Sequence, residues 1–197
     1  MPARASGFKS PFGHRYKWNW NVMNLADALA LIRDIPDYPK PGILFKDITP
    51  LLAHPEGFQT IVNAFSELIE NPSAIAGIEA RGFIFASAIA INKNCGFVPF
   101  RKSGKLPHET ISAKYSLEYG SDELEVHIDA FKVGQRVVIV DDVLATGGTI
   151  SAAIELAMQS GAVIESVMVL FEIQGLGGRE LIAKKYPHVK VISLVSS

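Results

Sequence analysis

The sequence contains a single cysteine, Cys95, among 197 residues. One cysteine excludes an internal disulfide and a metal site built from cysteines. No apolar run is long enough to span a bilayer, and the N-terminus lacks the apolar core of a secretory signal. The net charge is only −1, so no overall field attracts nucleic acid or an acidic membrane. We therefore expect a cytoplasmic protein whose partners include neither nucleic acid nor membrane.

Residues 1–23 lack acidic side chains and show no hydrophobic periodicity. They contain four basic residues, Arg4, Lys9, Arg15 and Lys17. A basic arm for nucleic acid is one interpretation, but four charges are a weak signal for it. We interpret the segment as a disordered extension, and Met23 is an alternative start because recognisable sequence begins at Asn24.

The remaining 24–197 are long enough for one sizeable core. The chain is 48% hydrophobic and 20% charged, as in an ordinary globular domain. Asn24 can cap a helix whose apolar residues recur at helical spacing, and Pro36 should end that helix. A rigid proline-rich turn at 37–42 and a short extended segment at 43–48 follow.

Strands and helices then alternate along the chain. Apolar runs predict strands at 74–78, 96–100, 137–140, 163–171 and 189–194. Helices are predicted at 55–70, 83–93, 150–159 and 178–185, and a hairpin at 115–119 and 124–128. This order is typical of an α/β fold with a mainly parallel central sheet flanked by helices. Ligands bind at the carboxyl ends of such strands, where 79–82, 101–107 and 141–149 follow them.

The segment 136–149 carries the strongest functional signal. A run of β-branched residues, Val137 to Val140, predicts a strand buried on both faces, and Asp141 and Asp142 follow where it should end. A small-residue loop then opens onto a helix: Ala145, Thr146, Gly147, Gly148 and Thr149. Its backbone N–H groups and the helix N-terminus are suited to a phosphate. An ordinary acidic turn before a glycine-rich loop is the alternative, but the order of the parts favours a phosphorylated sugar as ligand.

Two other clusters of cations lie at the same predicted edge. Arg81 follows the strand 74–78 and can make a bidentate contact with phosphate oxygens. Arg101, Lys102 and Lys105 lie in a segment interrupted by glycine. A solvated surface loop is the default interpretation, and beside a phosphate site we favour a mobile flap that closes on polyphosphate.

Five motifs together resemble those of the adenine phosphoribosyltransferases, a family of type I phosphoribosyltransferases. They are 41–48 (PGILFKDI), 79–83 (EARGF), 101–107 (RKSGKLP), 115–120 (YSLEYG) and 137–149. They occur in the family's order, and the similarity covers roughly 24–195. The resemblance implies the type I fold for 24–197, with a small hood at about 37–50 over the active site.

The resemblance also implies roles for single residues. The loop from Ala145 to Thr149 would hold the 5′-phosphate of 5-phosphoribosyl pyrophosphate (PRPP), and Asp141 and Asp142 would address the ribose. Arg81, Lys102 and Lys105 would bind pyrophosphate, with Arg101 reaching across the interface of a homodimer. Other roles fall to Leu44, Phe45, Lys46 and Glu118.

Phe45 would stack on adenine while the backbones of Leu44 and Lys46 read its edge. Many members have arginine in place of Lys46, which matters little for a backbone contact. Glu118 would help adenine lose its N9 proton. Taken singly, Phe45 could equally be a core residue and Glu118 a solvated strand residue.

The implied reaction is adenine plus PRPP giving AMP plus pyrophosphate, a purine-salvage step. Mg²⁺ is expected, held mainly through PRPP. Two alternatives stay open: a phosphoribosyltransferase for another purine base, and a PRPP-binding regulator of transcription. The segment around Phe45 argues against the first, and too few residues precede Asn24 for a DNA-binding module of the second kind.

Overall fold

The computed structural model describes residues 23–116 and 121–196. The chain divides into two compact units, one ending at Phe58 and the other beginning at Gln59. We describe each unit by itself. Within the described residues, no helix is both long and apolar enough to cross a membrane.

The first unit contains α1 (Leu25–Ala30), a two-stranded antiparallel sheet and α2 (Thr49–Ala53). Asn24 caps α1 as predicted, since its side chain accepts a hydrogen bond from the Asp27 N–H at 2.9 Å. The predicted continuation of this helix to Pro36 is wrong. β1 (Arg33–Ile35) pairs instead with β2 (Phe45–Asp47), a contact that local periodicity cannot reveal. The sequence analysis also missed α2.

The second unit is built on a seven-stranded sheet in the order β5-β6-β4-β3-β7-β8-β9. The central strands β4, β3, β7, β8 and β9 are parallel, and β5 and β6 form the antiparallel edge. The prediction of a mainly parallel sheet is therefore confirmed. The strands are β3 (Ala74–Ile78), β4 (Gly96–Lys102), β5 (Thr110–Ser116), β6 (Ser121–His127), β7 (Arg136–Leu144), β8 (Val163–Glu172) and β9 (Lys190–Ser196).

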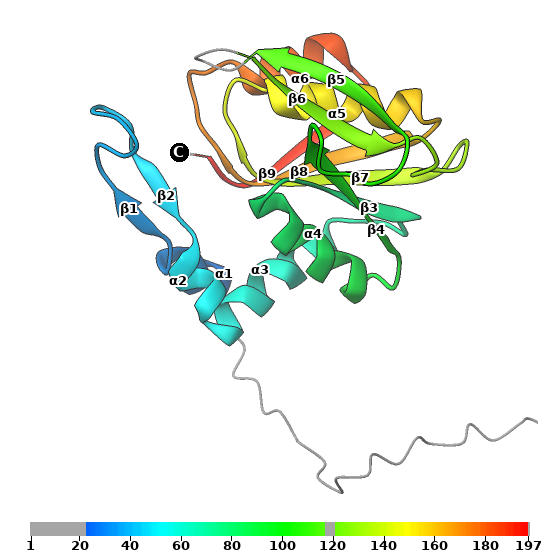
Figure 1. Cartoon of the computed structure of the whole chain (residues 1–197). Coiled ribbons are helices and arrows are strands. Elements are labelled where there is room, and N and C mark those ends of the chain that lie inside the picture. Colours follow the sequence, from blue (N-terminus) through cyan, green and yellow to red (C-terminus); the bar gives the residue numbers. More distant parts are fainter. Residues whose placement is uncertain (1–22, 117–120, 197) are drawn as a thin grey trace, which may run out of the picture. The chain divides into compact units, whose positions relative to one another are not determined.

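Helices cover both faces of this sheet. α4 (Arg81–Asn92) lies on one face, and α5 (Gly148–Gln159) and α6 (Gly178–Lys185) lie on the other (Figure 1). This follows from right-handed connections, because β3 connects to β4 in one direction along the sheet and β7 connects to β8 in the opposite direction. α3 (Pro55–Glu67) enters the second unit and packs against α4, where Phe65 meets Phe85 edge-on at 6.1 Å.

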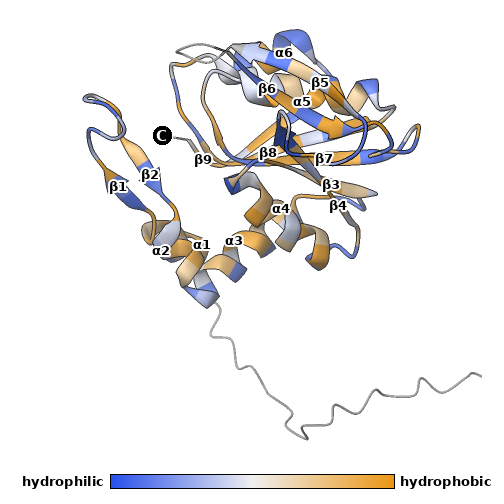
Figure 2. Cartoon of the chain, in the orientation of Figure 1, coloured by the Kyte–Doolittle hydropathy of each residue, from blue (hydrophilic) through white to orange (hydrophobic). Residues whose placement is uncertain are grey.

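The core lies between the central strands and these helices. Every residue of β3 is buried, and so are Val137 to Asp142 of β7. Figure 2 shows the apolar character of this central part of the chain, where Phe85, Phe100 and Ile139 have no exposed surface. Continuous apolar strands buried on both faces are what a parallel sheet requires.

The strand register brings the polar segments together at one edge. β3 lies between β4 and β7, with Ile78 opposite Phe100 and Gly77 opposite Val140. The residues that follow these positions therefore become neighbours. Two predicted strand ends are wrong. β7 continues to Leu144, so the two aspartates lie within the strand rather than after it. Arg101 and Lys102 likewise belong to β4 and not to a loop.

Candidate active site

Asp141 and Asp142 form a buried acidic pair that contacts Arg81. One guanidinium nitrogen of Arg81 lies 2.8 Å from a carboxylate oxygen of Asp142, whose side chain is only 6% exposed. The backbone N–H of Asp142 donates to Asp141 at 2.9 Å. Arg81 is the first residue of α4 and follows β3, so adjacent parallel strands bring the three residues together.

Burial changes the acidity of this pair. Desolvation raises the pKa of Asp141 well above its usual range, and the neighbouring Asp142 raises it further. Desolvation also raises the pKa of Asp142, although the charge of Arg81 opposes this. When both buried carboxylates are ionised, the charge of the partly exposed Arg81 balances only one of them. The pair is therefore prepared to accept a cationic group or a metal ion.

The backbone of α4 reaches the acidic pair through Gly82. A Cβ atom at this position would lie 2.8 Å from the Val140 carbonyl oxygen and 2.9 Å from an Asp141 carboxylate oxygen. Real Cβ atoms do not approach backbone this closely. Only glycine therefore lets the first turn of α4 rest against the end of β7.

The loop 145–149 connects β7 to α5 as the sequence predicts. Gly147 adopts a φ of 83°, which favours glycine, and α5 begins at Gly148. Gly178, the first residue of α6, packs directly against the loop, because a Cβ there would overlap the Ala145 carbonyl oxygen. The first N–H groups of α5 thus lie at the same carboxyl end of the sheet as Asp142.

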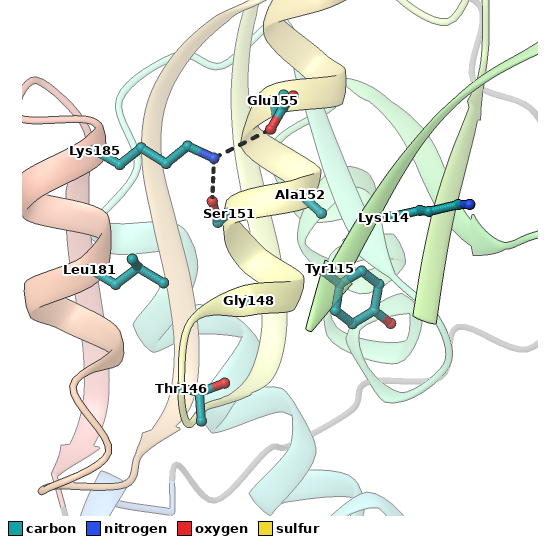
Figure 3. Close-up of a pocket in the computed structure, with 9 residues that line it drawn as sticks. All are labelled: Lys114, Tyr115, Thr146, Gly148, Ser151, Ala152, Glu155, Leu181 and Lys185. Atoms are coloured by element: carbon teal, nitrogen blue, oxygen red, sulfur yellow. Dashed lines mark hydrogen bonds and ion pairs between the residues drawn. The ribbon is translucent and has the colours of Figure 1, made fainter. Parts of the chain in front are cut away.

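A cleft of about 330 Å³ opens beside this loop (Figure 3). Thr146 and Gly148 line its end at the loop, and Tyr115 of β5 lines one wall. Along α5 the cleft reaches Lys185, whose ammonium contacts the Ser151 hydroxyl at 3.1 Å and the Glu155 carboxylate at 3.3 Å. The phosphate-type loop therefore lies beside open space.

Glu79 contacts the cations at the end of β4 and in the turn that follows it. Its carboxylate accepts hydrogen bonds from the Arg101 side chain at 3.2 Å, from the Lys102 N–H at 2.9 Å and from the Lys105 ammonium. Burial alone would raise the pKa of Glu79, but these hydrogen bonds outweigh it and lower the pKa to about 2. In this structure, Glu79 therefore neutralises part of the predicted polyphosphate site.

A second carboxylate holds the turn that follows β4. Glu125 of β6 accepts from the Ser103 hydroxyl at 2.8 Å and from the Gly104 N–H at 3.0 Å. These two contacts, which hold the turn to β6, are both polar. A polyanion that competes for the cations would exchange polar contacts of the turn for other polar contacts.

Tyr115 lies opposite Asp122 in the β5–β6 pair and lines the cleft beside the phosphate-type loop. Burial raises the pKa of Tyr115, and the negative charge of Asp122 raises it further. Asp122 in turn lies 2.9 Å from the Lys102 ammonium. Asp122 thus holds the end of β4 beside Tyr115.

The predicted base-recognition residues lie in the first unit. Phe45 begins β2 and is half-buried, with its ring edge-on to Tyr38 at a centroid distance of 5.1 Å. Leu44 is 50% exposed, and the Lys46 ammonium lies 2.7 Å from Asp34. Glu118, the predicted base, lies outside the described residues.

Comparison with known proteins agrees with this geometry. The family model of the phosphoribosyl transferase domain matches residues 47–194 of this sequence. An adenine phosphoribosyltransferase of Carboxydothermus hydrogenoformans is 51% identical over 171 residues, covering 86% of this chain and 98% of that protein. The chain belongs to the adenine phosphoribosyltransferase family.

Solved structures of the same family have the same fold. The enzyme of Thermoanaerobacter pseudethanolicus is 46% identical with a TM-score of 0.82, and the match covers 88% of this chain and 100% of that one. The Saccharomyces cerevisiae enzyme, crystallised with adenine and an imino-altritol bisphosphate, is 36% identical with a TM-score of 0.81. That match covers 87% of this chain and 98% of the yeast chain. The predicted type I phosphoribosyltransferase fold is therefore confirmed.

The acidic pair also fits the magnesium ion that adenine phosphoribosyltransferases are expected to use. Within the described residues, no group of three or more His, Cys, Asp or Glu side chains could hold a metal. Mg²⁺ usually takes one or two carboxylates and completes its shell with water and substrate phosphates. Asp141 and Asp142 supply that number of carboxylates, with a deficit of positive charge beside them.

Sequence reasoning missed the acidic partners of this adenine phosphoribosyltransferase site. Glu79 falls within the motif 79–83 without a predicted role, and no signal in the sequence points to Glu125 or Asp122. Glu79 stands two residues before Arg81 at the end of a buried strand. That position is a usable signal, because the predicted strands 74–78 and 96–100 correspond to β3 and to the first part of β4.

Proposed function

We propose that the chain transfers the phosphoribosyl group of PRPP to adenine, giving AMP and pyrophosphate in purine salvage. The observation that carries this proposal is the junction of β7 and α5. There a buried acidic pair, ion-paired to Arg81, stands three residues before a phosphate-type loop. A phosphorylated ribose presents hydroxyls for the carboxylates and a phosphate for the loop.

The 5′-phosphate of PRPP binds at residues 145–149. Backbone N–H groups at the start of α5 donate to its oxygens, and the helix dipole favours the negative charge. Thr146 and Thr149 add hydroxyl donors. The positive φ of Gly147 and its close approach to α6 support this assignment, because they fix the backbone before ligand binds.

Asp141 and Asp142 accept hydrogen bonds from the ribose hydroxyls. Breaking the bond from C1 to pyrophosphate builds positive charge on the ribose, and nearby carboxylates stabilise that charge. Their burial removes competing water, which strengthens the effect. Asp141, Asp142 and the oxygens of PRPP would hold Mg²⁺, which neutralises charge on the leaving pyrophosphate when bound.

Arg81, Arg101, Lys102 and Lys105 bind the pyrophosphate group. Arg101 and Lys105 now contact Glu79, and pyrophosphate, with more negative charge than one carboxylate, competes for them. The turn at 103–104 can follow because its contacts with Glu125 are polar. This is the closing movement expected of a flap.

Adenine stacks on Phe45, and the backbones of Leu44 and Lys46 bond to its edge. The half-exposed ring of Phe45, fixed by Tyr38, is suited to stacking. The Lys46 side chain forms an ion pair with Asp34, and a contact between the Lys46 backbone and adenine does not require that side chain. Glu118 accepts the N9 proton as a general base. We assign the enzyme to 24–197 with a hood at about 37–50, in the cytoplasm.

The enzyme forms a homodimer through the outer face of α4. Ile91 is 83% exposed there, and Ile84, seven residues earlier on the same face of α4, is 36% exposed. Apolar side chains gathered on one face are typical of an interface, and Arg101 would reach across it. Analytical ultracentrifugation should give twice the chain mass, and Ile91→Glu should shift the enzyme towards monomer.

The direct test incubates the enzyme with adenine, PRPP and MgCl₂ and follows AMP and pyrophosphate by chromatography. We expect equal amounts of both products, and none when PRPP is left out. Tight PRPP binding without turnover of any base would point to a regulator instead. Failure to bind PRPP would reject the assignment of the 145–149 loop.

A further inference from the structure

A second cavity of the second unit lies at the amino ends of β7, β8 and β9, away from the acidic pair. Its volume is about 190 Å³, the space of roughly six water molecules. Arg136, the first residue of β7, lines it, whereas Asp141 comes five residues later on the same strand. Five residues of a strand span about 17 Å, so this cavity is separate from the PRPP site.

A β-bulge in β8 adds a polar side chain to this cavity. Val137 lies opposite Ile164, but Val138 lies opposite Ser166, so Glu165 is an extra residue in the pairing. Successive residues of a regular strand point to opposite faces of a sheet, yet Glu165 and Ser166 both line the cavity. The bulge therefore brings a carboxylate and a hydroxyl to the same cavity.

Two cations and two carboxylates belong to the lining, and one pair of them is joined. Arg136 donates through Nε to Glu165 and through Nη2 to the Glu70 carbonyl oxygen at 3.4 Å. Lys190 lies opposite Ser166, which is only 7% exposed. In the part of the chain that the structure describes, no hydrogen bond or ion pair engages the side chains of Lys190, Ser166 or Glu70. One cation, one carboxylate and one hydroxyl thus remain for a ligand.

The rest of the lining is apolar. Leu68 and Ile69 follow α3, and Val138 and Ile192 belong to β7 and β9. Val138 is buried and Ile192 is half-buried, so a hydrocarbon group placed against them would lose contact with water. A ligand that fits must combine one charge of each sign with a small hydrocarbon group.

We propose that this cavity binds a free α-amino acid whose side chain is small and apolar. The amino-acid carboxylate accepts hydrogen bonds from the Lys190 ammonium and the Ser166 hydroxyl, and its ammonium pairs with Glu70. Its side chain packs against Val138 and Ile192. A simple anion would leave Glu70 unmatched, and a nucleotide would not fit in 190 Å³. The inference does not rest on the proposed function, because no residue of the PRPP site takes part.

Calorimetric titration of the full chain with L-leucine tests this site. We expect a Kd on the order of 1 mM, as for a small ligand held by few contacts. Two analogues supply the chemical controls: 4-methylpentanoate lacks the ammonium of leucine, and 3-methylbutylamine lacks its carboxylate. Each should bind at least about tenfold more weakly, because each loses hydrogen bonds between charged groups. Saturation with AMP should leave the Kd of leucine unchanged.

Variants at the two free charges locate the ligand. Lys190→Met keeps an aliphatic stem without the ammonium, and Glu70→Gln keeps the shape without the charge. Each should raise the Kd of leucine at least about fivefold while the melting temperature stays near that of wild type. Lys184→Met, at an exposed lysine of α6, is the matched control and should bind leucine as wild type does.

Three results would each overturn the proposal. They are a wild-type chain that does not bind leucine at 20 mM, a concentration roughly twentyfold above the expected Kd, a Kd that Lys190→Met leaves unchanged, and displacement of leucine by AMP. Displacement would place leucine in the PRPP site instead. Turnover of adenine and PRPP is measured separately, so failure of the amino-acid site leaves the proposed function intact.

Discussion

The Arg81 guanidinium lies 2.8 Å from the Asp142 carboxylate, which joins the start of α4 to the end of β7. The arginine is 38% exposed while the aspartate is 6% exposed, so the contact spans the surface of the site. A ligand phosphate can therefore reach Arg81 without disturbing the buried carboxylate. Positive charge that develops on a bound ribose would be stabilised by Asp142, whose carboxylate Arg81 already holds in place.

Asp142→Asn should lower kcat/KM for PRPP by about 10²–10³-fold, the typical effect of losing one electrostatic contact to a transition state. The amide has the shape of the carboxylate without its buried charge, so the melting temperature should change little. Asp129→Asn, at an exposed aspartate, is the matched control and should keep wild-type kinetics. Wild-type rates in Asp142→Asn would leave the acidic pair without a catalytic role.

Gly82→Ala should destabilise the fold by about 1–3 kcal/mol and reduce activity, because the new Cβ meets the Val140 carbonyl and the Asp141 carboxylate. Alanine is otherwise the better residue in a helix, so any loss reports on that contact. Gly96→Ala, where nothing lies within 4 Å, is the control and should be close to neutral. Urea denaturation of both variants measures the difference. A Gly82→Ala protein as stable and active as wild type would contradict the close packing of α4 on β7.

Glu79→Gln should change how stability depends on pH. The folded pKa of Glu79 is about 2, below its ordinary value of 4.5, so its contribution is present above about pH 4.5 and is lost as pH falls toward 2. The difference in unfolding free energy between wild type and Glu79→Gln should therefore be largest near pH 7 and shrink below pH 4.5. Urea titrations at pH 7, 4 and 3 measure it. A difference that stays constant over this range would mean that Glu79 does not hold Arg101 and Lys105 in solution.

The parallel sheet and the phosphate-type loop could be predicted because their signals are local. Val137 to Val140 form a continuous β-branched run, and Gly147 is the residue that a positive φ requires. Strand order along a parallel sheet then places Arg81 and the aspartates at one edge. These parts need no knowledge of distant contacts.

The contacts that could not be predicted join distant residues. Glu79 binds Arg101 and Lys105, which are 22 and 26 residues away, and the register of β3 and β4 decides which charges meet. β1 replaced a predicted helical turn because Arg33–Ile35 pairs with Phe45–Asp47. The ion pair of Lys102 with Asp122 likewise depends on the pairing of β4 with β6. Periodicity contains no information on such pairs.

The choice of base tests the account most directly. With PRPP and Mg²⁺ held constant, kcat/KM should be measured for adenine, hypoxanthine, guanine and xanthine. Phe45 can stack on any purine, so discrimination must come from hydrogen bonds of the Leu44 and Lys46 backbone to the ring edge. Hypoxanthine has an oxo group where adenine has an amine, and a buried acceptor left unpaired costs about 1–3 kcal/mol. We predict that adenine is preferred over every other purine by at least about tenfold; a higher kcat/KM for hypoxanthine, guanine or xanthine would contradict the assignment to adenine.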